Sequence, residues 1–296
     1  MTMRKAVLVV NPCAGRGSGA RLAPEVVREL RRLGVDAEMR LTARPRHAVE
    51  LVAKAVADGA SEVLVAGGDG TIFEAVNGML AAGPTRCALG IVPIGTGNDF
   101  VKMLGLTDWR IACERIAAGQ SRAVDIGRCG PHHFANGVGV GFDAQVAHFA
   151  NGISWLSGTP VYALALLKVL TFDYRRPQLR IEHDGGALEQ RVTLVAIANG
   201  RCYGGAFHVA PNAALDDGLL ELVVAEGLSR TRVLGLLPKV LKGTHLDHPA
   251  VTALRSRRVR IASNTPLVVH ADGEILDLAA TSVEVELLPG ALRVLC

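Results

Sequence analysis

The sequence has no long uninterrupted hydrophobic stretch. The 296-residue chain is 49% hydrophobic, yet no apolar run reaches the roughly 18–20 residues that a membrane-spanning helix needs. The longest candidate, Val161 to Leu170, is shorter and is soon followed by Arg175. The first residues pass directly into a short apolar run, so we expect no cleavable signal peptide. These absences predict a cytoplasmic protein.

Paired cysteines and strong charge are also missing. The six cysteines have scattered spacings without a C-x-x-C pair, which argues against a zinc or dithiol site and favours reduced thiols. The histidines lack metal-ligand spacing, and we interpret them as surface or satisfied core residues. The net charge of +4 permits attraction to anionic lipid or a nucleotide, but it is too small to predict nucleic-acid binding.

The first part of the chain alternates between two kinds of segment. Helices are expected over residues 20–33, 46–58 and 108–118 and from Ile72 onward, because apolar residues recur there at helical spacing. Strands are expected over residues 6–10, 35–41, 63–66 and 88–92. This alternation predicts an α/β domain over residues 1–122, with a mainly parallel sheet and helices on both faces.

The remaining residues, 123–296, read as a mainly antiparallel β-sandwich domain. Asp184-Gly185-Gly186 is a hairpin signal between two expected strands. Three helices are expected, over residues 143–151, 160–172 and 229–242, and the last strands could return towards the first domain. The other expected strands cover residues 123–128, 132–140, 179–182, 191–198, 219–225, 258–262, 267–270, 283–288 and 292–295.

The stretch from Gly67 to Thr71, Gly-Gly-Asp-Gly-Thr, lies between an expected strand and an expected helix. That arrangement aims backbone N–H groups at a phosphate. Asp69 would repel the anion unless a cation bridged them, so it suggests a Mg²⁺-nucleotide. The alternative is a glycine-rich turn in which Asp69 caps the helix.

Two further glycine loops follow strands, at residues 11–19 and 93–100. In a parallel sheet, the carboxyl ends of the strands share one edge, and ligands bind there. We therefore expect the three glycine loops to converge. A dinucleotide-binding dehydrogenase is not expected, because no G-x-G-x-x-G follows the first strand with an acidic residue some 20 positions on.

Five motifs in order resemble the soluble bacterial diacylglycerol kinase-like lipid kinases, relatives of the sphingosine kinases. They are Gly67–Thr71 with Asn77-Gly78, Pro93–Phe100, Asn199–Ala206, Ala210-Pro211 with Asp216–Leu220, and Asp272-Gly273-Glu274. The resemblance covers essentially the whole chain. It implies phosphorylation of a lipid hydroxyl with ATP and Mg²⁺, a nucleotide site on the first domain, and a β-sandwich that receives the lipid.

The resemblance also implies which residues contact ATP. Taken alone, Thr42 would be a strand-end threonine, and Asn98-Asp99 could simply cap the next helix. Phe73 departs from the family, where a small polar residue is usual, and removes a possible polar contact near the nucleotide. The implied positions are Asn11, Pro12, Gly15, Thr42, Gly67, Gly68, Asp69, Gly70, Thr71, Phe73, Gly95, Thr96, Asn98 and Asp99.

By the same resemblance, Asp217 with the carbonyls of Ala214 and Leu219 matches a structural Mg²⁺ site. The alternative is a plain Asp-Asp-Gly hairpin turn. Glu274 falls at the catalytic position, where it would accept or orient the proton of the lipid hydroxyl, and Asp272 is the adjacent candidate. Asp69 completes the predicted catalytic set. By sequence alone, Asp272-Gly273-Glu274 is a strand-connecting turn.

Two other functions remain open at this point. One is an NAD kinase-like enzyme, which shares Gly-Gly-Asp-Gly-Thr, and the other is a non-catalytic nucleotide- or lipid-binding regulator. For a lipid kinase, the partner is a lipid substrate at a membrane surface, reached by transient peripheral contact, with a homodimer possible. The apolar helix near Val161–Leu170 and the basic cluster Arg255, Arg257, Arg258 and Arg260 could dock it; alternatively, the helix is core and the arginines are solvated.

Overall fold

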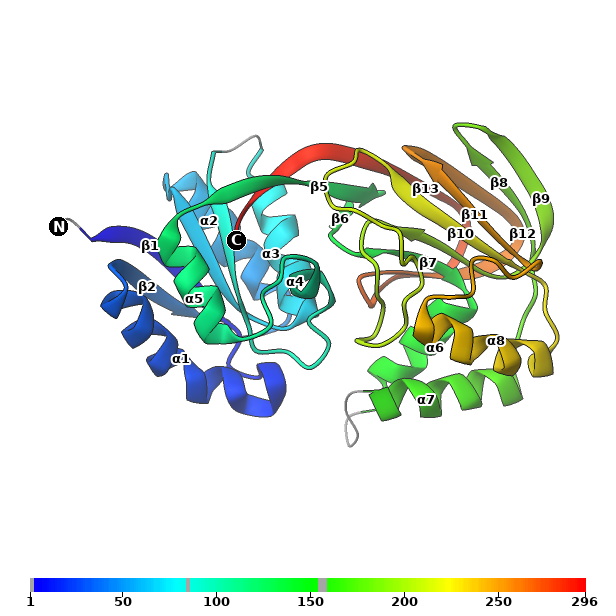
Figure 1. The fold of residues 1–296 in the computed structure, drawn as a ribbon, viewed down its shortest axis with the longest axis horizontal. Helices are drawn as coiled ribbons and strands as arrows, with labels where there is room; N and C mark the ends of the chain where they lie inside the picture. The colour runs from blue at the N-terminus through cyan, green and yellow to red at the C-terminus, as the bar shows by residue number, and fades with distance from the viewer. Residues whose placement is uncertain (1–2, 84–85, 154–158) are drawn as a thin grey trace. The chain divides into compact units, whose positions relative to one another are not determined.

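A computed structural model describes residues 3–83, 86–153 and 159–296 (Figure 1). The chain divides into two compact units, one formed by Met1–Asp125 with Pro289–Cys296 and the other by Ile126–Leu288. Two strands, β5 (Ser121–Cys129) and β13 (Glu274–Leu295), run from one unit into the other. The division therefore lies inside β5, close to the expected boundary at residues 122/123, and the last strand ends in the first unit.

The first unit holds a parallel sheet. Its strands are β1 (Arg4–Val10), β2 (Val35–Leu41), β3 (Glu62–Gly67), β4 (Ala88–Pro93) and the end of β13, in the order β2-β1-β3-β4-β13. Every neighbouring pair is parallel. All residues of β3 and β4 are buried, as expected for central strands covered on both faces.

Helices cover both faces of this sheet. Apolar residues of α1 (Ala14–Arg32) and α5 (Trp109–Ala118) share one core cluster with alternate residues of β1 and β3. On the other face, α2 (His47–Ala57) and α3 (Asp69–Ala81) pack so closely that a Cβ added at Gly78 would lie 2.9 Å from the Cβ of Val52. The chain thus leaves β1 and β3 on opposite faces, which places the topological switch point between them.

The regular part of α1 begins later than its first assigned residue. Gly15, Arg16 and Gly17 have positive φ angles of 56°, 59° and 85°, so the segment after β1 is a loop before it becomes a helix. The expected helix over residues 20–33 is therefore close to the regular part of α1. The short α4 (Asp99–Met103) follows β4.

The second unit is built on antiparallel strands. Their order is β11-β10-β9-β7-β12-β13, and a hairpin of β5 and β6 pairs with β13. The bounds are β6 (His132–Phe134), β7 (Gly137–Gly141), β8 (Gln178–His183), β9 (Gly186–Ala198), β10 (Leu220–Glu226), β11 (Val251–Ser256) and β12 (Arg258–Ala271).

Several predicted strands differ from those observed. The prediction of one strand over residues 132–140 is wrong, because two separate strands, β6 and β7, occupy this region. The expected pairs 258–262 with 267–270, and 283–288 with 292–295, each form one continuous strand, β12 and β13. In β12, the pairing with β13 shifts register between Ala262 and Leu267. Pro266 lies in this stretch and has no N–H to donate to a neighbouring strand. The sequence reading missed β11.

Strands β7 and β8 share one strand position in the sheet, between β9 and β12. Both pair with β9 and with β12, β7 along one end and β8 along the other. The chain between them leaves the sheet as α6 (Phe142–Asn151), α7 (Thr159–Lys168) and the π-helical turn η1 (Val169–Asp173). The helical segment between β7 and β8 therefore begins directly beside the centre of the sheet.

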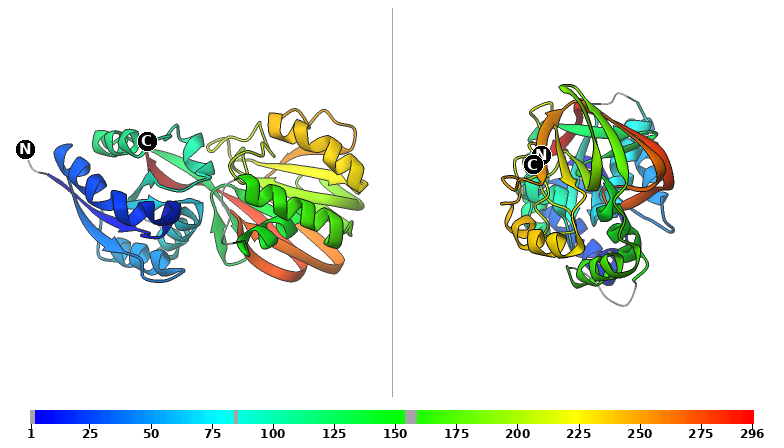
Figure 2. Two further views of the ribbon diagram at one scale, coloured as in Figure 1. Left: turned by 90° about the horizontal axis from the view of Figure 1, so that it is seen from below. Right: turned by 90° about the vertical axis from the view of Figure 1, so that its right-hand side faces the viewer.

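One face of this sheet is covered by helices. Figures 1 and 2 show α6, α7 and α8 (Arg230–Lys242) along it, and their apolar side chains share a core cluster with residues of β9, β10 and β11. The helix expected over residues 160–172 is observed as α7 continued by η1. Among the described residues, no helix is both long and apolar enough to cross a membrane.

Candidate functional site

Three glycine loops of the first unit meet at the carboxyl ends of β1, β3 and β4. A Cβ added at Gly95 would lie 2.4 Å from the Cα of Gly68, and one added at Gly15 would lie 2.3 Å from the carbonyl oxygen of Ile94. The amide side chain of Asn11 donates to the Thr71 hydroxyl at 3.0 Å. The contacts of Gly95 and Gly15 require glycine, and the three contacts bring the loops together at the switch point, as the sequence predicts.

Asp69 ties two of these loops together. Its carboxylate oxygens accept hydrogen bonds from the backbone N–H of Asn98 at 2.7 Å and of Asp99 at 2.8 Å. Burial raises the pKa of Asp69, and the two N–H donors act in the opposite direction. The carboxylate thus caps the start of α4 as well as beginning α3. It also excludes a side chain at Gly97, where a Cβ would lie 2.6 Å from its Oδ2.

The other predicted nucleotide residues lie around the same edge. The Thr42 N–H donates to the Val10 carbonyl at 2.9 Å just after β2, while Thr96 is exposed and Phe73 is buried on α3. Asn98 has a φ angle of 54°, and its side chain donates to the Gly95 carbonyl. The N-cap of α3 is Gly68, which has no side chain that could cap the helix, and an exposed helix N-terminus attracts anions. Pro12 and Gly70 lie in the same loops.

The predicted catalytic turn of the second unit joins β12 to β13. The Asp272 carboxylate accepts three backbone hydrogen bonds, from Ala135 at 2.7 Å, Asn136 at 2.9 Å and Gly137 at 2.8 Å. This explains the break between β6 and β7, because a side chain replaces a strand partner there. The Glu274 side chain is exposed.

A buried polar pair that the sequence reading missed lies beside this turn. His270 Nε2 lies 3.4 Å from Asp143 Oδ2, and His270 Nδ1 accepts the N–H of Gly273 at 3.2 Å. The pair comes from β12 and α6, 127 residues apart. No local pattern marks such a pair, and the interpretation of His270 as a surface or satisfied core histidine did not identify these contacts.

Tyr203 closes over the same pair. Its ring meets that of His270 edge-on, with centroids 5.9 Å apart. Burial, with the nearby carboxylates of Asp143 and Asp272, holds the pKa of Tyr203 well above its ordinary value, so the phenol stays protonated. Gly137 is required beneath it, since an added Cβ would lie 2.0 Å from the Tyr203 hydroxyl.

The predicted metal residues belong to the second unit, whereas the glycine loops belong to the first. Asp217 is exposed; its Oδ1 accepts the Leu219 N–H at 3.1 Å, and its Oδ2 lies 3.7 Å from an Arg255 nitrogen. Ala214 precedes the turn. Among the described residues, no group of three or more His, Cys, Asp or Glu side chains forms a metal site, so carbonyl oxygens would have to complete a cation shell.

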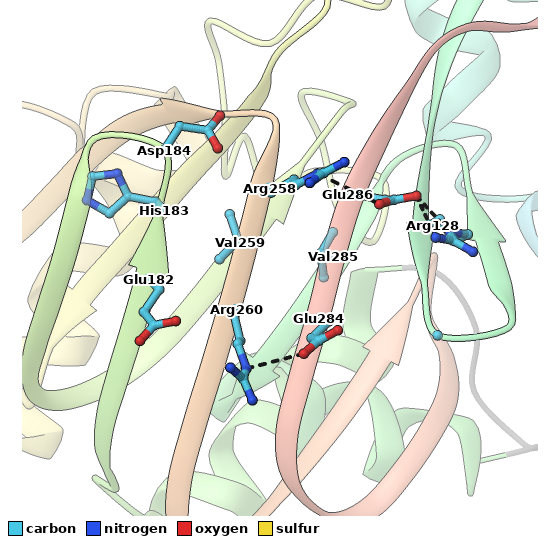
Figure 3. A pocket seen from close by; sticks show the side chains of 11 residues that line it. Arg128, Glu182, His183, Asp184, Arg258, Val259, Arg260, Glu284, Val285 and Glu286 are labelled. Carbon is cyan, nitrogen blue, oxygen red and sulfur yellow. Dashed lines mark hydrogen bonds and ion pairs between the residues drawn. The ribbon is translucent and has the colours of Figure 1, made fainter.

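A charged pocket lies on β12 and β13 (Figure 3). Arg258 and Arg260 pair there with Glu286 at 4.0 Å and Glu284 at 3.2 Å. Arg255 pairs with Glu221 at 2.8 Å. Three arginines of the predicted basic cluster therefore have carboxylate partners, which reduces the positive charge that this surface offers.

Comparison with known proteins covers both units. Residues 5–129 match the family described as the diacylglycerol kinase catalytic domain, and residues 136–296 match the YegS C-terminal NAD kinase beta sandwich-like domain. A diacylglycerol kinase of Mycobacterium tuberculosis is 32% identical over 98% of this chain and 94% of the relative. One of Bacillus subtilis is 26% identical over 92% and 90%.

Solved structures agree with this fold. A crystal structure of a Bacillus anthracis protein aligns with a TM-score of 0.82 at 26% identity, over 100% of this chain and 96% of that one. A second, of a diacylglycerol kinase from the same organism, gives a TM-score of 0.76 at 23% identity, over 100% and 97%. The predicted two-domain fold and the predicted family are confirmed. The chain belongs to the diacylglycerol kinase family, and it is a kinase.

Proposed function

We propose that this kinase transfers the γ-phosphate of ATP, with Mg²⁺, to the free hydroxyl of a diacylglycerol-like lipid. The observation that carries the proposal is the meeting of three glycine loops at the switch point, held together by the partly buried Asp69 carboxylate. The names of the relatives point to diacylglycerol as the acceptor.

The first unit would hold the nucleotide. Gly68 and Gly95 lie too close together for either to carry a side chain, so backbone rather than side chains lines this edge between them. Phosphate oxygens accept such donors, and the positive end of α3 adds attraction. Mg²⁺ bound with the nucleotide would neutralise charge that develops on the transferred phosphoryl group. Asp69 would keep the two loops in place around that charge.

The second unit would supply the base. A general base needs an accessible lone pair near the hydroxyl proton. The Asp272 oxygens already accept three backbone hydrogen bonds, whereas the Glu274 carboxylate is exposed. We therefore assign proton acceptance to Glu274, and we assign to Asp272 the fixing of the turn that carries it.

Asp217 would hold a second, structural Mg²⁺ with the carbonyls of Ala214 and Leu219. The exposed carboxylate and its weak 3.7 Å pair with Arg255 fit this role, because a divalent cation can replace a distant ion pair. Such an ion would stabilise the turn before β10 and would take no part in phosphoryl transfer.

The enzyme would work at a membrane surface from the cytoplasm. The α7–η1 segment exposes apolar side chains: Leu164 is 40%, Leu167 58% and Phe172 82% accessible. Lys168 lies between them and can approach anionic head groups. This segment fits a docking role better than the arginines of β11 and β12, which have carboxylate partners.

The direct test uses purified chain, labelled ATP and Mg²⁺ with a short-chain diacylglycerol or NAD as acceptor. We expect phosphorylated lipid from the wild type and none from Glu274→Gln. Labelled NAD instead of lipid would indicate an NAD kinase-like enzyme. Nucleotide binding without any product from a lipid extract would indicate a regulator.

A further inference from the structure

His270 has a single arrangement of its ring proton in this structure. The Gly273 N–H can only donate, so His270 Nδ1, 3.2 Å away, must accept and carries no proton. The proton therefore lies on Nε2, which faces Asp143 Oδ2 at 3.4 Å. A carboxylate that faces one ring nitrogen in this way fixes both the tautomer and the orientation of the imidazole.

The side chains of His270 and Asp143 can meet over β7 because Gly139 has no side chain. Gly139 is the cross-strand neighbour of His270. A Cβ added there would lie 2.0 Å from Asp143 Oδ2 and 2.2 Å from His270 Nε2. The His270 side chain is 6% exposed and that of Asp143 19%. These two side chains therefore fill the space over Gly139.

The pair acts on the turn that carries Glu274. The peptide before Gly273 is held through its N–H by His270. The peptide after Gly273 is held through its carbonyl, which accepts from the Asn151 side chain at 3.0 Å. Gly273 has a φ angle of 87° and would otherwise be the most flexible point of the turn. The two side chains thus fix both peptide planes that lead into Glu274.

We propose that His270 and Asp143 are positioning residues for phosphoryl transfer. Asp143 holds the Nε2–H tautomer of His270, and the unprotonated Nδ1 accepts from the Gly273 N–H. This hydrogen bond fixes the Gly273 peptide and with it the direction of Glu274. The inference rests on the proposed function, in which Glu274 accepts the hydroxyl proton. Displacing a catalytic base by about 1 Å can lower the rate on the order of 100-fold. Loss of the hydrogen bond that fixes the Gly273 peptide could therefore change the rate of phosphoryl transfer measurably.

Two substitutions separate the two nitrogens of His270. In His270→Asn, the amide oxygen can occupy the place of Nδ1 and still accept from Gly273. In His270→Gln, the amide reaches the place of Nε2 and leaves Gly273 without its acceptor. We would measure kcat and KM with MgATP and a short-chain diacylglycerol, together with the melting temperature. We expect His270→Asn to stay within about threefold of the wild-type kcat and His270→Gln to lose roughly 10- to 100-fold.

The KM for ATP should stay unchanged in both variants, because the nucleotide loops belong to the other unit. Gly139→Ala keeps both side chains but forces them to move, so it should lower kcat in the same way as His270→Gln. If Asn and Gln lose equal activity in proportion to lost stability, His270 only fills space and the inference is wrong. If the wild type phosphorylates no diacylglycerol, the proposed function fails and the inference fails with it; an active wild type with indistinguishable variants overturns the inference alone.

Discussion

At the scale of single residues, the two carboxylates of the Asp272-Gly273-Glu274 turn have opposite surroundings. The Asp272 oxygens accept three N–H groups of the β6–β7 break, and Asp272 itself has a φ angle of 49°. Glu274 is exposed on the same turn. One carboxylate is thus part of the fold, and the other is accessible to solvent.

Alanine substitutions should separate these roles. Asp272→Ala leaves three backbone N–H groups without their acceptor, and each such loss costs about 1–3 kcal/mol when the group is buried. We expect a drop of about 3 kcal/mol in the free energy of unfolding together with loss of kinase activity. Glu274→Ala should abolish activity and shift the denaturant midpoint much less than Asp272→Ala does. Equal destabilisation by both variants would contradict the assignment.

The cysteines allow a test of burial by pH-dependent chemistry. Burial raises the pKa of Cys87 to about 11, of Cys113 to about 12 and of Cys129 to about 11. At pH 8 less than about one in 500 of these thiols is ionised, so they should resist a thiol-specific disulfide reagent. Cys13, Cys202 and Cys296 are exposed or half-buried and should react. We expect three equivalents of label before denaturation and six after it.

The same shifts set the sign of a pH effect. Folding keeps these thiols protonated, whereas the unfolded chain ionises them near the ordinary pKa of 9.0. The free energy of unfolding should therefore fall as the pH rises from about 9 towards 11. The triple variant with serine at the three buried positions removes this dependence. A slope that is the same in the variant would show that other groups cause it.

At the scale of elements, the β5–β6 hairpin depends on one close ring contact. Phe134 is fully buried and lies across the strand pair from Gly127. A Cβ added at Gly127 would lie 1.9 Å from the Phe134 ring. The glycine is therefore a packing requirement of this hairpin, which leads into the segment held by Asp272.

Gly127→Ala should destabilise the protein by about 2 kcal/mol, because an extra methyl group in a filled core forces neighbouring groups to move. Gly235→Ala is the matched control: this α8 glycine has open space around its would-be Cβ, and alanine is favoured in a helix interior by roughly 0.5–1 kcal/mol. Urea unfolding should show opposite shifts of the midpoint. A neutral Gly127→Ala would mean that the ring can turn away at no cost.

Elements were predictable where periodicity and glycine punctuation agree. The alternation of the first unit and the loops after β1, β3 and β4 follow from local patterns. The ends and joins of the antiparallel strands do not, because distant contacts decide them. For example, β13 continues through Pro289 and Gly290, whose N–H donates to the Asp125 carboxylate at 2.7 Å, although the sequence there reads as a turn.

The candidate site shows the same limit. Asp69, Asp272 and Glu274 stand in recognisable motifs, but their partners do not. The N–H groups that bind Asp272 lie 135 to 137 residues earlier, and Asp143 lies 127 residues from His270. Only the folded sheet brings such groups together, so a single sequence identifies the candidate catalytic turn and misses the groups that hold it.

At the scale of the whole molecule, Mg²⁺ should raise stability without ATP if Asp217 holds an ion. An ion that binds only the folded chain stabilises it increasingly as its concentration rises. We expect the melting temperature to increase with Mg²⁺ for the wild type and much less for Asp217→Ala. An identical response of both proteins would exclude this site and would attribute the effect to other carboxylates.

The last prediction concerns binding of the whole protein to lipid. If α7 and η1 dock, the double variant Leu167→Ser with Phe172→Ser should bind vesicles that contain anionic lipid at least about tenfold more weakly, because burying one large apolar side chain contributes about 1.5–3 kcal/mol. Arg258→Gln with Arg260→Gln is the matched control, since both arginines already have carboxylate partners. Sedimentation with vesicles measures binding, and turnover of a short-chain soluble diacylglycerol should be normal in both variants. Weaker binding of the arginine variant than of the apolar variant would move the docking surface from the helices to the strands.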